Sequence, residues 1–145
     1  MRRLLLASAG LLCMIATAHT PARAAPDALR GEQVYTRCQA CHALAYDRVG
    51  PRHCGLFGRR AGSVAGFSYS AAMKQSGIVW NDRTLDRFLT HPLKMVPGNA
   101  MTYDCVADPK ERADLIAYLK QVKDTPECAR QAPQRELPSV ERSRR

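Results

Sequence analysis

The chain has 145 residues and a formal net charge of +9, and 46% of its residues are hydrophobic. This length fits one domain. Aromatic residues make up only 6% of the chain and are not interleaved with the basic ones. Nucleic acid is therefore the least favoured partner of this basic protein, and an acidic protein or an anionic membrane surface fits its charge better.

Residues 1–24 have the pattern of a secretory signal peptide. Arg2 and Arg3 precede an uncharged apolar run over 4–18, and Ala-Arg-Ala over 22–24 is a small-x-small cleavage site. A membrane anchor is the alternative, but the run is shorter than the roughly 20 apolar residues that a span needs. We therefore predict a periplasmic protein, cleaved after Ala24, whose folded domain covers residues 25–125.

The first folded element is predicted to be a helix over residues 28–35, which leads into Cys38-Gln39-Ala40-Cys41-His42. Two cysteines two residues apart, followed at once by a histidine, are the attachment signature of a c-type haem. A thioredoxin-like dithiol would need a βαβ context, and a zinc ribbon would need a second cysteine pair, and the chain has neither. The motif predicts one covalent haem, attached through Cys38 and Cys41, with His42 as a metal ligand.

Two short helices are predicted next, over residues 70–75 and 82–90, and the residues between the haem motif and Gly66 show no alternating strand pattern. The connecting loops are long, which normally argues against a compact domain. Here a large apolar cofactor can fill the core and support them. The sequence therefore predicts a small all-α fold, with about four to five helices and long loops wrapped around one haem.

The clearest helix is the last one. Asp108 can cap its N-terminus, Pro109 suits the first helical position, and Glu111 stands where a capping box needs it. Four apolar residues recur at helical spacing and predict one buried face: Leu115, Ile116, Leu119 and Val122. Residues 126–145 have three prolines, many charges and no apolar period, so they are predicted to form a mobile, basic C-terminal tail.

A methionine is a common second ligand of a haem iron that a histidine already holds. Met73 lies in a predicted helix, Met95 precedes a Pro-Gly turn, and Met101 follows that turn in a segment free to reach the haem. Met101 is therefore the favoured second metal ligand. His53 and His91 are the alternatives on the residues alone.

The order of these motifs resembles that of class I c-type cytochromes, of the mitochondrial cytochrome c and bacterial cytochrome c2 or c550 type. The likeness runs from about Gly31 to Leu119. Besides the haem motif, it rests on Gly-Leu-Phe-Gly-Arg over 55–59, Val-Pro-Gly-Asn-Ala-Met over 96–101 and Arg-Ala-Asp-Leu-Ile-Ala-Tyr-Leu over 112–119.

The resemblance implies a role for each residue of the haem site. His42 and Met101 would be the two axial ligands, and the carbonyl of Pro51 would accept the proton of the other His42 nitrogen. The positions of His53 and His91 are not at the iron in this family. Three further residues would surround the haem propionates: Arg59, Tyr69 and Trp80.

The chain departs from the family pattern at several positions. Phe88 stands where the family has a tyrosine whose hydroxyl bonds the methionine sulfur, and Arg52-His53-Cys54 replaces the usual Asn-Leu-His. Three cysteines remain outside the haem motif, an odd number, so at most one disulfide is expected within a monomer. The placement of these segments in the family fold favours Cys54 with Cys128, and Cys54 with Cys105 is the alternative.

The function predicted from these motifs is single-electron transfer by a soluble monohaem carrier, not an enzyme. The expected partners are acidic docking faces of redox proteins, such as a membrane cytochrome complex, a terminal oxidase, a photosynthetic centre or a periplasmic dehydrogenase. Neither nucleic acid nor a small-molecule substrate is expected, and the protein is expected to be a monomer. A haem enzyme or gas sensor with a labile Met101 is the alternative, which the missing hydroxyl at Phe88 favours.

Overall fold

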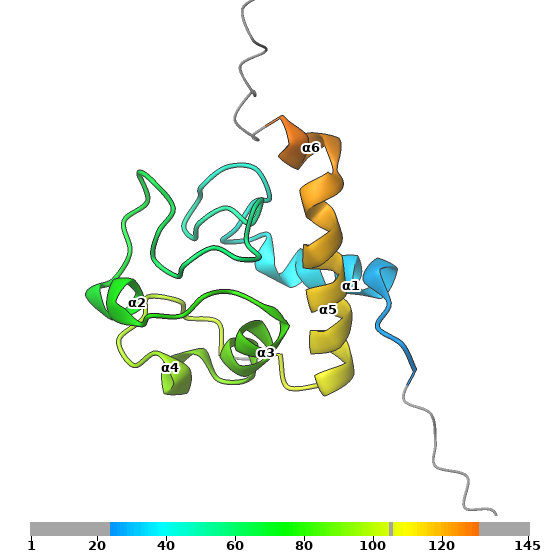
Figure 1. Ribbon diagram of the computed structural model, residues 1–145. Coiled ribbons are helices and arrows are strands. Elements are labelled where there is room, and N and C mark those ends of the chain that lie inside the picture. Colours follow the sequence, from blue (N-terminus) through cyan, green and yellow to red (C-terminus); the bar gives the residue numbers. More distant parts are fainter. Residues whose placement is uncertain (1–23, 105, 131–145) are drawn as a thin grey trace, which may run out of the picture.

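The structure, a computed structural model, describes residues 24–104 and 106–130. The predicted signal peptide up to residue 23, Cys105 and the tail beyond residue 130 lie outside the described residues. Within them the chain is all-α, as predicted, with six α-helices, two short 3-10 helices and no strand (Figure 1). The elements are α1 (Ala28–Tyr35), η1 (Thr36–Cys38), α2 (Ala71–Gln75), α3 (Asp82–Thr90), α4 (Pro92–Met95), α5 (Pro109–Gln121), η2 (Val122–Asp124) and α6 (Pro126–Ala129).

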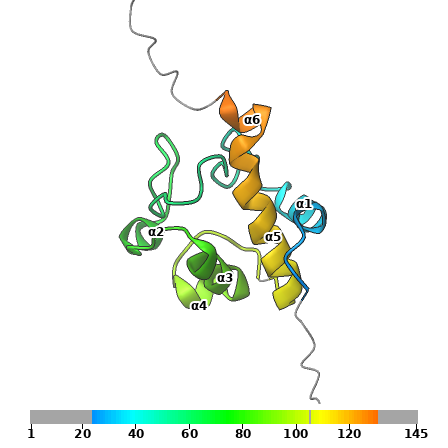
Figure 2. The same ribbon diagram turned by 45° about the vertical axis from the view of Figure 1, so that its right-hand side comes forward.

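The first and last long helices, α1 and α5, cross each other in both views (Figures 1 and 2). Gly31 permits this approach, because a Cβ there would overlap the carbonyl oxygen of Asp114 and lie 2.8 Å from the Cβ of Tyr118. The buried carboxylate of Asp114 accepts a hydrogen bond from the backbone N–H of Asp27 at 2.6 Å and from Nζ of Lys110 at 2.7 Å. These bonds fix the start of α1 against α5.

The N-terminus of α5 agrees in part with the prediction made from the sequence. Pro109 begins the helix, and the carboxylate of Asp108 accepts a hydrogen bond from the backbone N–H of Lys110 at 2.7 Å. The predicted capping box is wrong, because the Glu111 carboxylate forms an ion pair with Arg37 of η1 at 2.6 Å instead. The carboxylate of Glu111 thus binds a residue distant in the sequence instead of the backbone N–H of Asp108, which a capping box would require.

The predicted apolar face of α5 is buried, together with side chains of α1 and α3. Loops fill the other half of the molecule, and an isolated bridge between Arg60 and Val79 ties two of them together. None of the helices in the described ranges is both long and apolar enough to span a membrane. The buried core comprises mainly Val34, Tyr35, Leu56, Trp80, Leu85, Phe88, Leu89, Val106, Leu115, Ile116 and Leu119.

Two four-residue helices were not predicted. One is α4, which begins at Pro92, two residues after the end of the helix predicted over 82–90. Residues 126–129, which the sequence assigns to the tail, form α6, and a disulfide joins Cys128 to Cys54 with the Cα atoms 5.2 Å apart. The preferred pairing is thus the one present in the structure, and it joins the helical residues 126–129 to the loop that carries Cys54.

Candidate haem-binding site

A cavity of about 410 Å³ lies at the centre of the loop-rich half of the molecule. Its lining comes from segments far apart in the sequence, including the haem motif, the loop over 49–59, residues 67–73 up to the start of α2, and residues 100–103. All eight residues that the sequence analysis assigned to the cofactor line this one cavity: Cys38, Cys41, His42, Pro51, Arg59, Tyr69, Trp80 and Met101.

The haem motif is folded as a tight turn that follows η1. The carbonyl of Cys38 accepts hydrogen bonds from the backbone N–H of Cys41 at 3.1 Å and of His42 at 2.9 Å. This turn directs both thiols and the imidazole to the cavity. Neither thiol belongs to a disulfide, and burial raises the pKa of the Cys38 thiol.

His42 is oriented by the backbone of the next loop. Its Nδ1 donates a hydrogen bond to the carbonyl oxygen of Pro51 at 2.7 Å, the contact that the resemblance implies. Gly50 lies so close that a Cβ there would be 2.6 Å from Nδ1 and would overlap Cε1 of the ring. Burial lowers the pKa of His42, against the effect of the Pro51 hydrogen bond. The lowered pKa favours the neutral imidazole, the form in which histidine binds metal.

Two of the three candidate methionines reach the cavity. Met101 and Met73 line it, whereas Met95 does not. The exposed His91, one of the alternative ligands, is likewise not among the lining residues.

Asn99 holds the Met101 segment in place, a role that the sequence analysis missed. Its buried side-chain amide donates hydrogen bonds to the carbonyls of Pro92 at 3.0 Å and Val96 at 2.9 Å. Its side-chain oxygen accepts the backbone N–H of Met101 at 2.8 Å. An Asn directly after a Pro-Gly turn is a known turn former, and this was the available signal.

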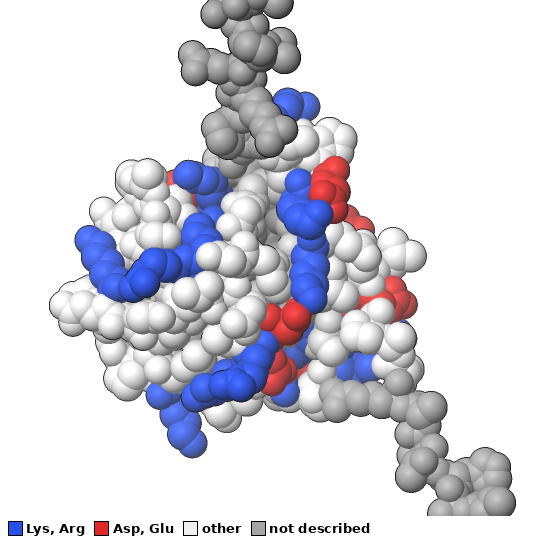
Figure 3. Space-filling view, in the orientation of Figure 1, with Lys and Arg blue, Asp and Glu red and all other residues white. Residues whose placement is uncertain are grey.

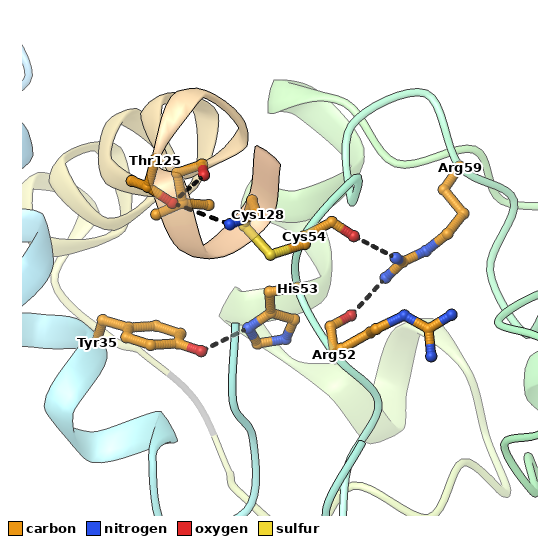
Figure 4. Close-up of a disulfide and its surroundings, with 8 residues drawn as sticks. Tyr35, Arg52, His53, Cys54, Arg59, Thr125 and Cys128 are labelled. Carbon is orange, nitrogen blue, oxygen red and sulfur yellow. Dashed lines mark hydrogen bonds between the residues drawn. A yellow bond between two sulfur atoms is a disulfide. The ribbon is translucent and has the colours of Figure 1, made fainter. Parts of the chain in front are cut away.

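Of the three residues assigned to the propionates, Arg59 and Tyr69 lie in the long connection between η1 and α2, and Trp80 lies between α2 and α3. The guanidinium of Arg59 donates hydrogen bonds to the carbonyl of Cys54 at 3.0 Å and to that of Arg52 at 2.8 Å (Figure 4). Burial lowers the pKa of Arg59, but arginine remains charged. Trp80 packs edge-to-face on Phe88 with ring centroids 5.2 Å apart, so both rings form part of the apolar wall.

His53, an alternative ligand on the residues alone, lies where the family resemblance does not place it. It lines the cavity, and its ring stacks on that of His42, with centroids 4.3 Å apart and planes 20° apart. Its Nδ1 is hydrogen-bonded to the hydroxyl of Tyr35 at 3.1 Å (Figure 4). Burial lowers the pKa of His53 well below its ordinary value, with further lowering by His42 and Arg59.

The residues of this cavity fit a covalently bound haem. Two thiols and a neutral imidazole share one turn, and a thioether comes from a distant segment. The apolar part of the lining suits the porphyrin, and the half-buried guanidinium of Arg59 suits its carboxylates. Apolar lining side chains include Leu56, Leu85, Phe88, Leu89, Leu115 and Leu119.

Comparisons with known proteins agree with this chemistry. The family model described as Cytochrome c matches residues 28–123. The chain is 46% identical to cytochrome c of Cochliobolus lunatus over 99 residues, which cover 66% of this chain and 92% of that protein. It is 42% identical to cytochrome c2 of Blastochloris viridis over 113 residues, covering 76% of this chain and 88% of that protein.

A solved structure of cytochrome cH from Methylobacterium extorquens is also similar, with a TM-score of 0.63 and 41% identity. The match covers 65% of this chain and 97% of that chain. The chain therefore belongs to the cytochrome c family. As a member it is an electron carrier with covalently bound haem c, not an enzyme, and its partners are other redox proteins.

Proposed function

We propose that the haem is attached through Cys38 and Cys41, that His42 and Met101 are its axial ligands, and that the protein carries single electrons in the periplasm. One observation carries the ligand assignment: the haem motif and Met101, from distant parts of the chain, line the same cavity. When bound, the haem supplies an iron that accepts and releases one electron. A methionine ligand raises its reduction potential.

The surrounding residues have distinct tasks in this proposal. Pro51 accepts the Nδ1 proton of His42 and thereby fixes which nitrogen faces the iron. Arg59, held by two backbone carbonyls, supplies a positive charge for the propionates, with Tyr69 beside it and Trp80 in the apolar wall. The apolar lining keeps water out, so the haem iron would have surroundings of low polarity in both its oxidised and its reduced state.

The methionine assignment is tested by single substitutions of Met101 and Met73. The oxidised protein should show the weak near-infrared band of a sulfur–iron bond, and Met101→Ala should abolish the band and open the iron to small ligands. Met73→Ala is the matched control, because Met73 lines the same cavity. Loss of the band in Met73→Ala, with the band intact in Met101→Ala, would assign the ligand to Met73.

Basic side chains on one side of the molecule support docking to acidic partners. Lys74 of α2 and Lys94 of α4 are exposed, and both views place these helices on the same side, away from α6 (Figures 1 and 2). In Figure 3 the Lys and Arg side chains on the left of the molecule have few acidic neighbours, whereas those farther right have acidic side chains next to them. Charges so arranged accelerate encounter with an acidic face, and added salt weakens the effect.

The docking proposal is tested by Lys94→Glu, with Lys123→Glu as the control. Lys123 is exposed on η2, far from α4 (Figure 1). At low salt, Lys94→Glu should slow electron transfer to an acidic redox partner several-fold, and the difference should shrink as salt is added. Equal slowing in both variants would show that overall charge, not this side of the molecule, decides the rate.

Export is tested by the mature N-terminus. Sequencing of the purified protein should give Ala25 as its first residue, and cell fractionation should place it in the periplasm. A haem stain after denaturing electrophoresis should follow the protein band, because thioethers survive denaturation. Haem that extracts into acid acetone would contradict covalent attachment.

A further inference from the structure

The ring of His53 makes two specific contacts at the cavity. One face packs in parallel on the ring of His42, with centroids 4.3 Å apart. Its Nδ1 is hydrogen-bonded to the Tyr35 hydroxyl at 3.1 Å, and the ring of Tyr35 meets it edge-on, with centroids 5.6 Å apart. His53 belongs neither to the haem motif nor to the residues assigned to the propionates, so neither role explains these contacts.

The backbone of His53 is as firmly held as its ring. Its N–H donates to the carbonyls of Ala43 and Leu44 at 3.2 and 3.0 Å. The next residue, Cys54, donates its own N–H to Leu44 at 2.8 Å and forms the disulfide with Cys128 (Figure 4). His53 is thus a rigid support and not a mobile surface group.

Its counterpart Tyr35 is equally fixed. The side chain is only 1% exposed, and it lies in α1 just before the turn that carries His42. Its ring also packs against Tyr118 of α5, with centroids 5.3 Å apart. The stacked ring therefore connects the haem motif to the crossing of the two main helices.

We propose that His53 is a positioning residue that sets the ring plane of His42. The hydrogen bond between His53 and the Tyr35 hydroxyl fixes the orientation of the His53 ring. The inference rests on the proposed role of His42 as an axial ligand. The Pro51 hydrogen bond fixes which nitrogen of His42 faces the cavity, and the backbone of Gly50 lies against the ring, but neither offers a flat surface that selects one ring plane. A flat ring stacked at 20° restricts rotation of the His42 ring, in the way that outer partners orient metal-ligating histidines.

The test compares His53→Leu, His53→Phe and Tyr35→Phe in the full, haem-loaded protein. The g-values of the oxidised protein in electron paramagnetic resonance, and the hyperfine-shifted proton signals of His42, report the orientation of the ligand plane. His53→Leu should shift both, since a branched aliphatic side chain does not select one plane. His53→Phe should restore most of the wild-type pattern, because a flat ring remains, and Tyr35→Phe should give an intermediate shift.

A matched control is His91→Leu, which removes an exposed histidine outside the cavity. It should leave both signals unchanged. Wild-type g-values and His42 signals in His53→Leu would overturn the inference, as would equal shifts in His53→Leu and His53→Phe. The absence of hyperfine-shifted His42 signals in the wild type would instead overturn the proposed ligation, so the two failures are distinguishable.

Discussion

The contribution of the disulfide between Cys54 and Cys128 to the free energy of unfolding can be tested directly. The perturbation is the double substitution Cys54→Ser/Cys128→Ser, which leaves neither sulfur to pair elsewhere. The bridge closes a sequence separation of 74 residues, for which chain entropy predicts about 4 kcal/mol. This is an upper value, because the attached haem already restricts the unfolded chain.

The native contacts at the bridge add a smaller contribution. Cys54 and Cys128 are buried together with Val122, which is only 1% exposed, so two serine hydroxyls would replace apolar packing. We expect the free energy of unfolding to fall by about 2 to 4 kcal/mol. The visible spectrum should not change, since neither residue is a predicted haem ligand.

The assay is guanidinium unfolding, followed by the fluorescence of Trp80 and by helical circular dichroism. The midpoint should fall. Ala129→Ser is the control, because it adds a hydroxyl to an exposed position of α6 and leaves the bridge intact. A loss below about 1 kcal/mol would refute the chain-entropy argument, and an altered native spectrum would refute the separation of bridge and haem site.

Three further predictions concern the haem wall and the helix crossing. Phe88→Tyr should lower the midpoint potential in a redox titration, since it returns a hydroxyl to the apolar wall near Met101, and a clear rise would show that another group dominates. Gly31→Ala should lower the free energy of unfolding by about 1 to 3 kcal/mol through overpacking against Asp114, and an unchanged value in thermal unfolding would contradict the close approach. Burial raises the pKa of Asp114, but hydrogen bonds from Lys110 and from the Asp27 N–H bring it below its ordinary value. The stability it contributes is therefore full above the ordinary carboxyl pKa of about 3.9 and is lost as the pH falls through the lower folded value. Acid titration of Asp114→Asn should show a lower stability at pH 7 and a weaker decline in acid, and an unchanged acid profile would contradict the assignment.

The sequence predicts the helices well where local signals and packing agree. The boundaries of α3 match the prediction, and a capping box of Asn81 and Thr84 begins the helix there. At α5 the cap at Asp108 was predicted correctly, but the role of Glu111 was not, because its partner Arg37 lies far away in the sequence. Local patterns cannot show which distant group competes for a side chain.

The candidate site shows the same limit. The eight predicted residues all line one cavity. They could be predicted because the motif spacing is a local signal and the remaining positions follow a pattern that the chain shares with its relatives. The role of His53 depends on Tyr35 and His42, which only the fold brings next to it. The role of Asn99 is local, because its partners lie within seven residues, and the Pro-Gly turn before it was the signal that was overlooked. The helix α6 was missed because its four residues are held by a disulfide and a threonine cap more than by an apolar period.

The crossing of α1 and α5 also governs the order of assembly. The two helices come from opposite ends of the domain, and Leu115 and Leu119 of α5 form part of the cavity wall. A chain that emerges from a translocation channel with its N-terminus first exposes Cys38 and Cys41 while that wall is still missing. Long-range closure is slow compared with local turns, so the open stage gives the attachment chemistry time to reach both thiols. Once α5 docks at Gly31, Leu115 and Leu119 complete the cavity wall.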